Sequence, residues 1–203
     1  MRVAGIPLGV ITQQLNYTLF MPFSSSLTQN LNQHNFVIQG SPTLVDNALY
    51  TGTSGINGVA NASDGLLAFG TNDFEIGLEC KLASFNNALI DCFASTGSGG
   101  FNTRGWQLFV YSDGRLSFYI LNSPSLEVIT DSPVLTINTW NKLNVTRVNS
   151  QLSIIVDDVI VKTAIVNDDF QRQFCAIGYQ FMDNGNGQYP TRGYIRNVYA
   201  RYL

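Results

Sequence analysis

Charged residues are scarce in this sequence, and basic residues are scarcer than acidic ones. Only 12% of the 203 residues carry charge, and 11 Lys and Arg against 14 Asp and Glu give a formal net charge of −3. Binding to the phosphates of a nucleic acid requires a basic excess, so a nucleic acid partner is not expected. Disordered chains are rich in charge and poor in aromatics, whereas this chain is 45% hydrophobic and 12% aromatic, which predicts a folded domain.

Long hydrophobic runs are also missing. No apolar stretch approaches the roughly 20 residues that span a bilayer, and the stretch 3–11 is interrupted by Gly and Pro and too weak for a signal peptide. We therefore expect synthesis in a host cytoplasm and no membrane partner. The three cysteines, Cys80, Cys92 and Cys175, are an odd number at long spacings inside apolar, strand-like runs, which favours buried, reduced thiols.

Amphipathic helical patterns are absent, and alternating patterns take their place. No stretch of 12 or more residues repeats apolar positions at helical spacing with caps at its ends. Alternation predicts strands over 74–82, 106–111 and 115–120, and Asp113-Gly114 between the last two is typical of a hairpin turn. Further strands are expected over 140–148, 151–156, 159–166, 174–180 and 193–202, with a long exposed loop over 181–190.

The order of six segments carries a family resemblance. These segments are 72–79 (NDFEIGLE), 105–108 (GWQL), 112–118 (SDGRLSF), 138–147 (NTWNKLNVTR), 152–159 (LSIIVDDV) and 193–198 (GYIRNV). Together they resemble the laminin G-like, concanavalin A-like family of lectin and glucanase jelly rolls, and most of all the variant found in bacteriophage structural proteins. The resemblance covers 17–203 and implies an all-β, antiparallel two-sheet β-sandwich.

The sequence departs from this family at one turn. Asp157-Asp158 stands where the family usually has Asp-Gly. Because Asp adopts the left-handed region less readily than Gly, we expect this turn to be longer or mildly strained.

Glu75 and Glu79 are the one pair that could correspond to the two catalytic glutamates that the resemblance to glucanases implies. Alternation places both on the solvent face of one strand, about 13 Å apart, with Gly77 where the glucanase motif has Asp. A retaining mechanism needs carboxyl groups about 5 Å apart. The single histidine, His34, lies in a polar segment without a nucleophile motif. We therefore expect no enzyme, and we expect Gln at both glutamates to change stability by less than about 1 kcal/mol.

Two loops offer groups for a ligand. Carbohydrate binding needs aromatic faces and planar polar groups, and the candidates here are Phe101, Asn102, Arg104, Asn184, Asn186 and Tyr189. Trp106 and Trp140 lie inside alternating strands and are expected in the core. Many laminin G-like domains hold calcium at one rim, which the resemblance extends to Asp183, but one carboxylate gives weak affinity, so no cofactor is expected.

The first residues precede the family resemblance and form an apolar segment of their own. We divide the chain into an N-terminal extended arm, 1–16, and the sandwich, 17–203. Gly5, Pro7 and Gly9 make the arm too broken for a helix and suited to lying over a neighbour. Its apolar side chains are Val3, Ile6, Leu8, Val10 and Ile11.

This arm and the phage resemblance predict a non-enzymatic virion component: a head decoration, cement or tail adsorption module. It would attach through its arm to other virion proteins or to copies of itself. The alternative is a lectin domain that recognises a host-surface polysaccharide.

Deletion of residues 1–14 tests the role of the arm. We expect the sandwich to keep its melting temperature while oligomerisation or particle attachment is lost, because the arm buries its side chains on a neighbour. A melting temperature lower by more than about 8 °C would instead make the arm an integral strand. Unchanged assembly would place the attachment in the loops.

Overall fold

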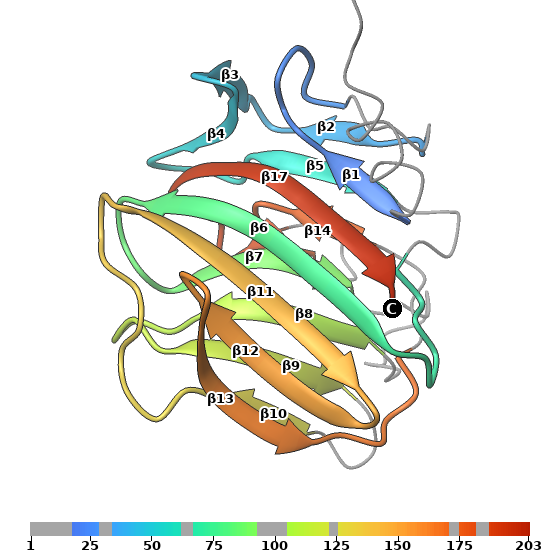
Figure 1. The fold of residues 1–203 in the computed structure, drawn as a ribbon. Helices are drawn as coiled ribbons and strands as arrows, with labels where there is room; N and C mark the ends of the chain where they lie inside the picture. Colours follow the sequence, from blue (N-terminus) through green and yellow to red (C-terminus); the bar gives the residue numbers. More distant parts are fainter. Residues whose placement is uncertain are drawn as a thin grey trace, which may run out of the picture.

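Antiparallel strands form the secondary structure of this chain. The computed structural model describes residues 18–28, 34–61, 67–92, 105–121, 126–170, 175–181 and 187–203, and these contain no α-helix. Two antiparallel sheets lie face to face as a β-sandwich jelly roll (Figure 1), which confirms the predicted fold class. No segment in the described ranges forms a helix that could span a bilayer. The arm, residues 1–16, lies outside them.

The first sheet has eight strands and is built around the C-terminal strand. Its order is β13 (Val159–Ile165), β12 (Gln151–Val156), β11 (Trp140–Val148), β6 (Phe74–Leu82), β17 (Gly193–Tyr202), β4 (Ala48–Gly52) and β3 (Thr43–Val45), with β1 (Leu19–Met21) also paired to β17.

The second sheet has seven strands and lies behind the first in Figure 1. Its order is β10 (Leu126–Ile129), β9 (Leu116–Leu121), β8 (Gly105–Val110), β7 (Asn87–Cys92), β14 (Cys175–Ile177), β5 (Gly58–Asn61) and β2 (Val37–Gln39). A separate hairpin pairs β15 (Gln180–Phe181) with β16 (Gly187–Gln188). Residues 181–190 therefore contain a short strand, which the composition of this segment did not predict.

Aromatic side chains fill the space between the sheets. Trp106 is fully buried, with its ring centroid 5.4 Å from that of Phe118 and 6.2 Å from that of Phe69, as its alternating strand predicts. The core prediction for Trp140 is wrong. This residue alternates onto the outer face of β11, where it is half-buried and the guanidinium of Arg196 lies 4.0 Å from its ring centroid.

The turn at Asp157-Asp158 has two residues, so the expected lengthening is wrong. Val156 pairs with Val159, and both aspartates adopt positive φ angles of 49° and 66°. Lys142 supports this conformation, because its backbone N–H donates to Asp157 at 2.8 Å and its Nζ donates to Asp158 at 2.6 Å. Short polar side chains with such partners tolerate the left-handed region that glycine would otherwise occupy.

The three cysteines are buried and unbridged, as the sequence predicts. All three are fully shielded in the core, Cys80 on β6, Cys92 on β7 and Cys175 on β14. Burial raises the pKa of the Cys80 thiol, and the nearby Asp157 carboxylate adds to this rise. The reactive thiolate is therefore disfavoured in the folded protein.

Alkylation without reductant checks the state of these thiols. We expect the native protein to react slowly and the unfolded protein to take up three modifications, one for each free cysteine. Intact-mass spectrometry distinguishes the two. An unfolded protein with one modification, and a mass lower by the two hydrogens that a bridge removes, would contradict the prediction.

Candidate functional site

The carboxylates of Glu75 and Glu79 are held in polar networks on the outer face of the eight-stranded sheet. This corrects the expectation that they lie unpartnered in solvent. Glu75 is only 9% exposed, and its Oε1 accepts hydrogen bonds from Asn144 Nδ2 at 3.0 Å and Tyr199 Oη at 2.8 Å. Arg201 Nε donates to its Oε2 at 2.8 Å. Alternation predicts the outward direction of Glu75 but not the residues on β11 and β17 that cover it.

Glu79 is bound by two consecutive residues at an irregularity of β17. Arg196 donates to its Oε2 through Nε at 2.9 Å and Nη2 at 2.6 Å, and Asn197 Nδ2 donates to its Oε1 at 2.7 Å. The register of β17 shifts here and Asn197 has a φ of 51°, which lets both side chains reach one face. Burial would raise the pKa of Glu79, but the hydrogen bonds from Asn197 and Arg196 outweigh it and lower the pKa.

A tyrosine ring lies between these two carboxylates. Tyr199 pairs with Gly77, and a Cβ at Gly77 would come within 2.4 Å of the ring, so the ring needs the glycine beneath it. A general acid of a glycosidase needs a raised pKa, whereas Glu79 has a lowered one. These two glutamates therefore stabilise the sheet.

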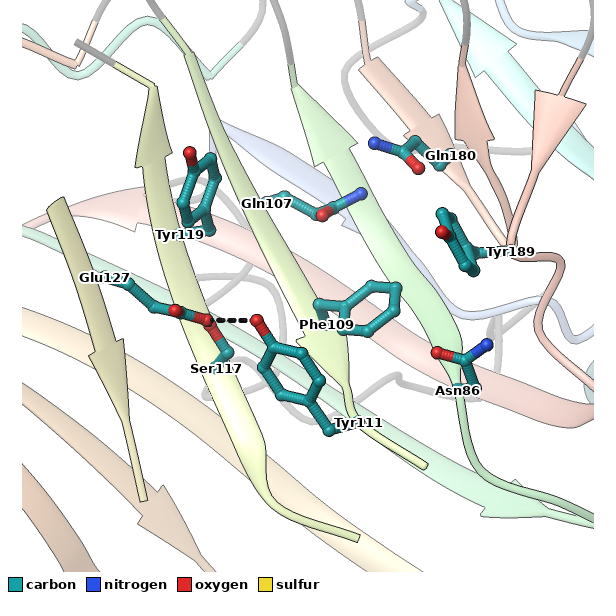
Figure 2. A pocket seen from close by; sticks show the side chains of 9 residues that line it. All are labelled: Asn86, Gln107, Phe109, Tyr111, Ser117, Tyr119, Glu127, Gln180 and Tyr189. Carbon is teal, nitrogen blue, oxygen red and sulfur yellow. Dashed lines mark hydrogen bonds between the residues drawn. The ribbon is translucent and has the colours of Figure 1, made fainter. Parts of the chain in front are cut away.

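The candidate functional site is a pocket of about 250 Å³ on the outer face of the seven-stranded sheet. Gln107 and Phe109 on β8 form one part of it, and Ser117 and Tyr119 on β9 and Glu127 on β10 form another (Figure 2). Register places these residues in two rows across the strands, since Gln107 pairs with Tyr119 and Tyr119 with Glu127, while Phe109 pairs with Ser117. The residues between them alternate into the core.

The opposite wall comes from loops and from the β15–β16 hairpin. Tyr189 follows this hairpin, and its carbonyl oxygen accepts a hydrogen bond from the Ala88 N–H at 2.9 Å. Its ring meets that of Phe109 edge-on, with centroids 5.4 Å apart. The nine lining residues are Asn86, Gln107, Phe109, Tyr111, Ser117, Tyr119, Glu127, Gln180 and Tyr189 (Figure 2).

Glu127 is the hydrogen-bond acceptor of the pocket. Its Oε1 receives the Tyr111 hydroxyl at 2.7 Å and the Ser117 hydroxyl at 2.6 Å. Burial and the hydrogen bond to Glu127 raise the pKa of Tyr111 to about 12, so this hydroxyl stays protonated. Two neutral donors therefore orient the carboxylate.

Gln107 is a buried donor without an acceptor. The residue is 6% exposed, and its Nε2 makes no hydrogen bond with any described residue. Buried amide groups in folded proteins are nearly always paired, and leaving one unpaired costs about 1–3 kcal/mol. In Figure 2 the side chain lies between the two walls of the pocket. The arrangement can therefore take a ligand that offers an acceptor oxygen to Gln107.

Only one of the binding residues predicted from sequence falls in the described ranges. Tyr189 lines the pocket. Sequence reasoning missed Gln107, Tyr119 and Glu127, although alternation in 106–111 and 115–120 already turns Gln107 and Tyr119 away from the core. The described ranges hold no group of three or more His, Cys, Asp or Glu that could bind a metal. Outside those ranges lie Phe101, Asn102, Arg104, Asn184 and Asn186, and also the calcium candidate Asp183.

Comparison with known proteins identifies the fold. No protein-family model and no curated protein sequence matches the chain. Among solved structures, domain 4 of AbnA, an extracellular GH43 arabinanase from Geobacillus stearothermophilus in complex with arabinotriose, is similar over 92% of both chains, with a TM-score of 0.71 and 14% identity. This similarity agrees with the β-sandwich jelly roll described above.

Two further similar structures share this sandwich. Domains LG4-5 of the mouse laminin α1 chain match 77% of this chain and 42% of theirs, with a TM-score of 0.59 and 18% identity. The binding domain of botulinum neurotoxin DC, in complex with rat synaptotagmin II, matches 93% of this chain at a TM-score of 0.68 and 13% identity. This chain spans about half the length of that domain, at 48%. At these levels of identity the similarity is one of fold.

Single substitutions test whether the hydrogen-bonded carboxylates of Glu75 and Glu79 stabilise the protein. Glu75→Gln should lower the free energy of unfolding by about 1–3 kcal/mol, because it leaves the partly buried Arg201 without its counter-charge. Glu79→Gln should cost less, about 1 kcal/mol at neutral pH, because that pair is more exposed to solvent. Urea denaturation measures both costs, with the exposed Asp131→Asn as the control.

The pH dependence of the second variant follows from the lowered pKa of Glu79. A lowered folded-state pKa contributes stability above the unfolded value and loses it as pH falls through the folded value. The difference between the wild type and Glu79→Gln should therefore shrink as pH falls below the ordinary glutamate pKa of about 4.3. If Glu75→Gln lowers the free energy of unfolding no more than Asp131→Asn does, the Glu75 carboxylate does not stabilise the sheet.

Proposed function

We propose that this domain is a glycan-binding module that takes a sugar residue into the pocket on its seven-stranded sheet. The observation that carries the proposal is Gln107, a buried amide with an unused donor between aromatic walls. Sugars present apolar C–H faces to aromatic rings and hydroxyl groups to planar polar side chains. Both kinds of group line this pocket.

The walls of the pocket provide both aromatic rings and polar side chains for a sugar. Tyr189 is 43% exposed, so much of its surface is open to a ligand, and its contact with Phe109 holds the ring in place. Asn86 and Gln180 add amides, and Glu127 adds a carboxylate. The volume of about 250 Å³ lies below the roughly 300–1,000 Å³ of drug-sized sites, so the pocket suits one sugar residue of a longer chain. The similar arabinanase domain was solved with arabinotriose, which supports this ligand class.

Binding without hydrolysis is part of the proposal. Glycosidases work with two carboxyl groups on either side of the scissile bond. Among the described residues that line the pocket, Glu127 is the one carboxylate. Glu75 and Glu79 lie on the outer face of the other sheet and are held in networks there.

Attachment to a virus particle through residues 1–16 stays a proposal from the sequence. In the sequence this segment precedes β1, and β1 pairs with β17 in the eight-stranded sheet, whereas the pocket lies on the seven-stranded sheet. An adsorption module requires that attachment to the particle leave the pocket open to a glycan. Co-purification of the protein with particles in stoichiometric copy number would support this role, and absence from the particles would exclude it.

A glycan array with three variants tests the sugar site. We expect Tyr189→Ala and Gln107→Leu each to weaken binding by about tenfold or more, because they remove the aromatic contact and the unused donor. The control is Tyr202→Ala on β17, which has a similar exposure of 48% but lies in the eight-stranded sheet. It should bind as the wild type does.

The stability of Gln107→Leu separates a ligand-binding role from a structural one. Leucine removes a buried, unpaired amide, so we expect the variant to be at least as stable as the wild type in urea while it fails to bind. A destabilised variant would mean that Gln107 serves the fold. A wild-type protein that binds no glycan, or variants that bind normally, would contradict the proposed function.

A further inference from the structure

We infer that the pocket takes uncharged sugar residues and rejects anionic ones, with Glu127 as the residue that determines this specificity. The inference rests on the proposed function and adds the class of sugar. It starts from the charges around the pocket. Glu127 is the one charged side chain among the described lining residues, and none of those residues is Lys or Arg.

A cation beside this wall, Arg115, already has a carboxylate partner. Arg115 lies with its guanidinium 5.7 Å from the ring centroid of Tyr111, and Tyr111 lines the pocket. Its Nε donates to Asp113 Oδ2 at 2.7 Å, and the Arg115 backbone N–H donates to the same carboxylate at 3.0 Å. Recognition of an anionic group normally uses a guanidinium or ammonium that points at it. Arg115 does not line the pocket and has its own carboxylate partner.

Glu127 is fixed in position on the β10 side. Tyr111 and Ser117 both donate to its Oε1, and it sits directly across from Tyr119 in the β9–β10 pair. In the described residues its Oε2 accepts no further hydrogen bond, which leaves this oxygen for a sugar hydroxyl. A carboxylate brought beside Glu127 would instead meet a like charge, with no cation among the described lining residues to offset the repulsion.

Gln107 supplies a second polar group, on the opposite side of Tyr119 from Glu127. It offers a donor, Nε2, and Glu127 offers an acceptor, with Tyr119 between them in the same cross-strand row. A sugar hydroxyl can serve as both donor and acceptor. An uncharged sugar, which carries hydroxyls on several carbons, offers groups of the right kind to both residues, whereas a carboxylate suits Gln107 but is repelled by Glu127.

The test compares sugars that differ only in charge. The probes are oligosaccharides of galactose or glucose and the corresponding oligomers of galacturonic or glucuronic acid, in which a carboxylate replaces the C6 hydroxymethyl group. We expect the wild type to bind at least one neutral member at least tenfold more tightly than its acidic counterpart. In Glu127→Gln, which keeps an amide oxygen for Tyr111 and Ser117, we expect that preference to shrink at least fivefold. Asp131→Asn removes the same charge from a residue that does not line the pocket and should keep the wild-type preference.

The outcomes separate this inference from the proposed function. Equal binding of neutral and acidic members by the wild type, or a preference that Glu127→Gln leaves unchanged, would overturn the specificity while glycan binding stands. Failure of every sugar to bind the wild type would overturn both. Thermal melting of Glu127→Gln verifies that the variant is folded, and a wild-type melting temperature assigns any changed preference to the lost charge.

Discussion

The burial of Trp106 between the two sheets is the constraint on which the rest of the pocket depends. Its ring packs against Phe118 and Phe69 in the core, which fixes the direction of every side chain on β8. Because successive residues of a strand point to opposite faces, Gln107 must then point outward. A slip of one residue would exchange the core face and the pocket face of the strand, so the core enforces the register of the site.

The two outer faces of the sandwich treat buried polar groups in different ways. On the eight-stranded sheet, the buried Glu75 has three hydrogen-bonding partners, Asn144, Tyr199 and Arg201. Such groups stabilise the fold because their partners offset the cost of burial. On the seven-stranded sheet, Gln107 keeps an unused donor. The buried carboxylate of the first face is therefore paired within the protein, whereas the Gln107 amide of the second face is not.

Local alternation accounts for the strands that the sequence predicts well. The bounds 74–82, 140–148, 151–156 and 193–202 agree with β6, β11, β12 and β17, since runs of six to ten residues show a clear period of two. The short strands β2, β3 and β5 were not predicted, because three or four residues carry no period and are ordered by pairing with neighbours. The outward direction of Gln107 and Tyr119 is likewise readable from the sequence, whereas their membership of one pocket is not.

The sequence by itself determined the all-β class, the long strands, the free thiols and the aromatic character of Tyr189, because each depends on residue type and local spacing. Only the tertiary structure decided which polar groups meet. Arg201 and Arg196 reach Glu75 and Glu79 from more than 110 positions away in the chain. Tyr189 reaches the β8 face through the β15–β16 hairpin in the same way. Hydrogen bonds and ion pairs form between groups that lie a few ångströms apart in space. The number of residues between two positions in the chain does not show whether their side chains are that close.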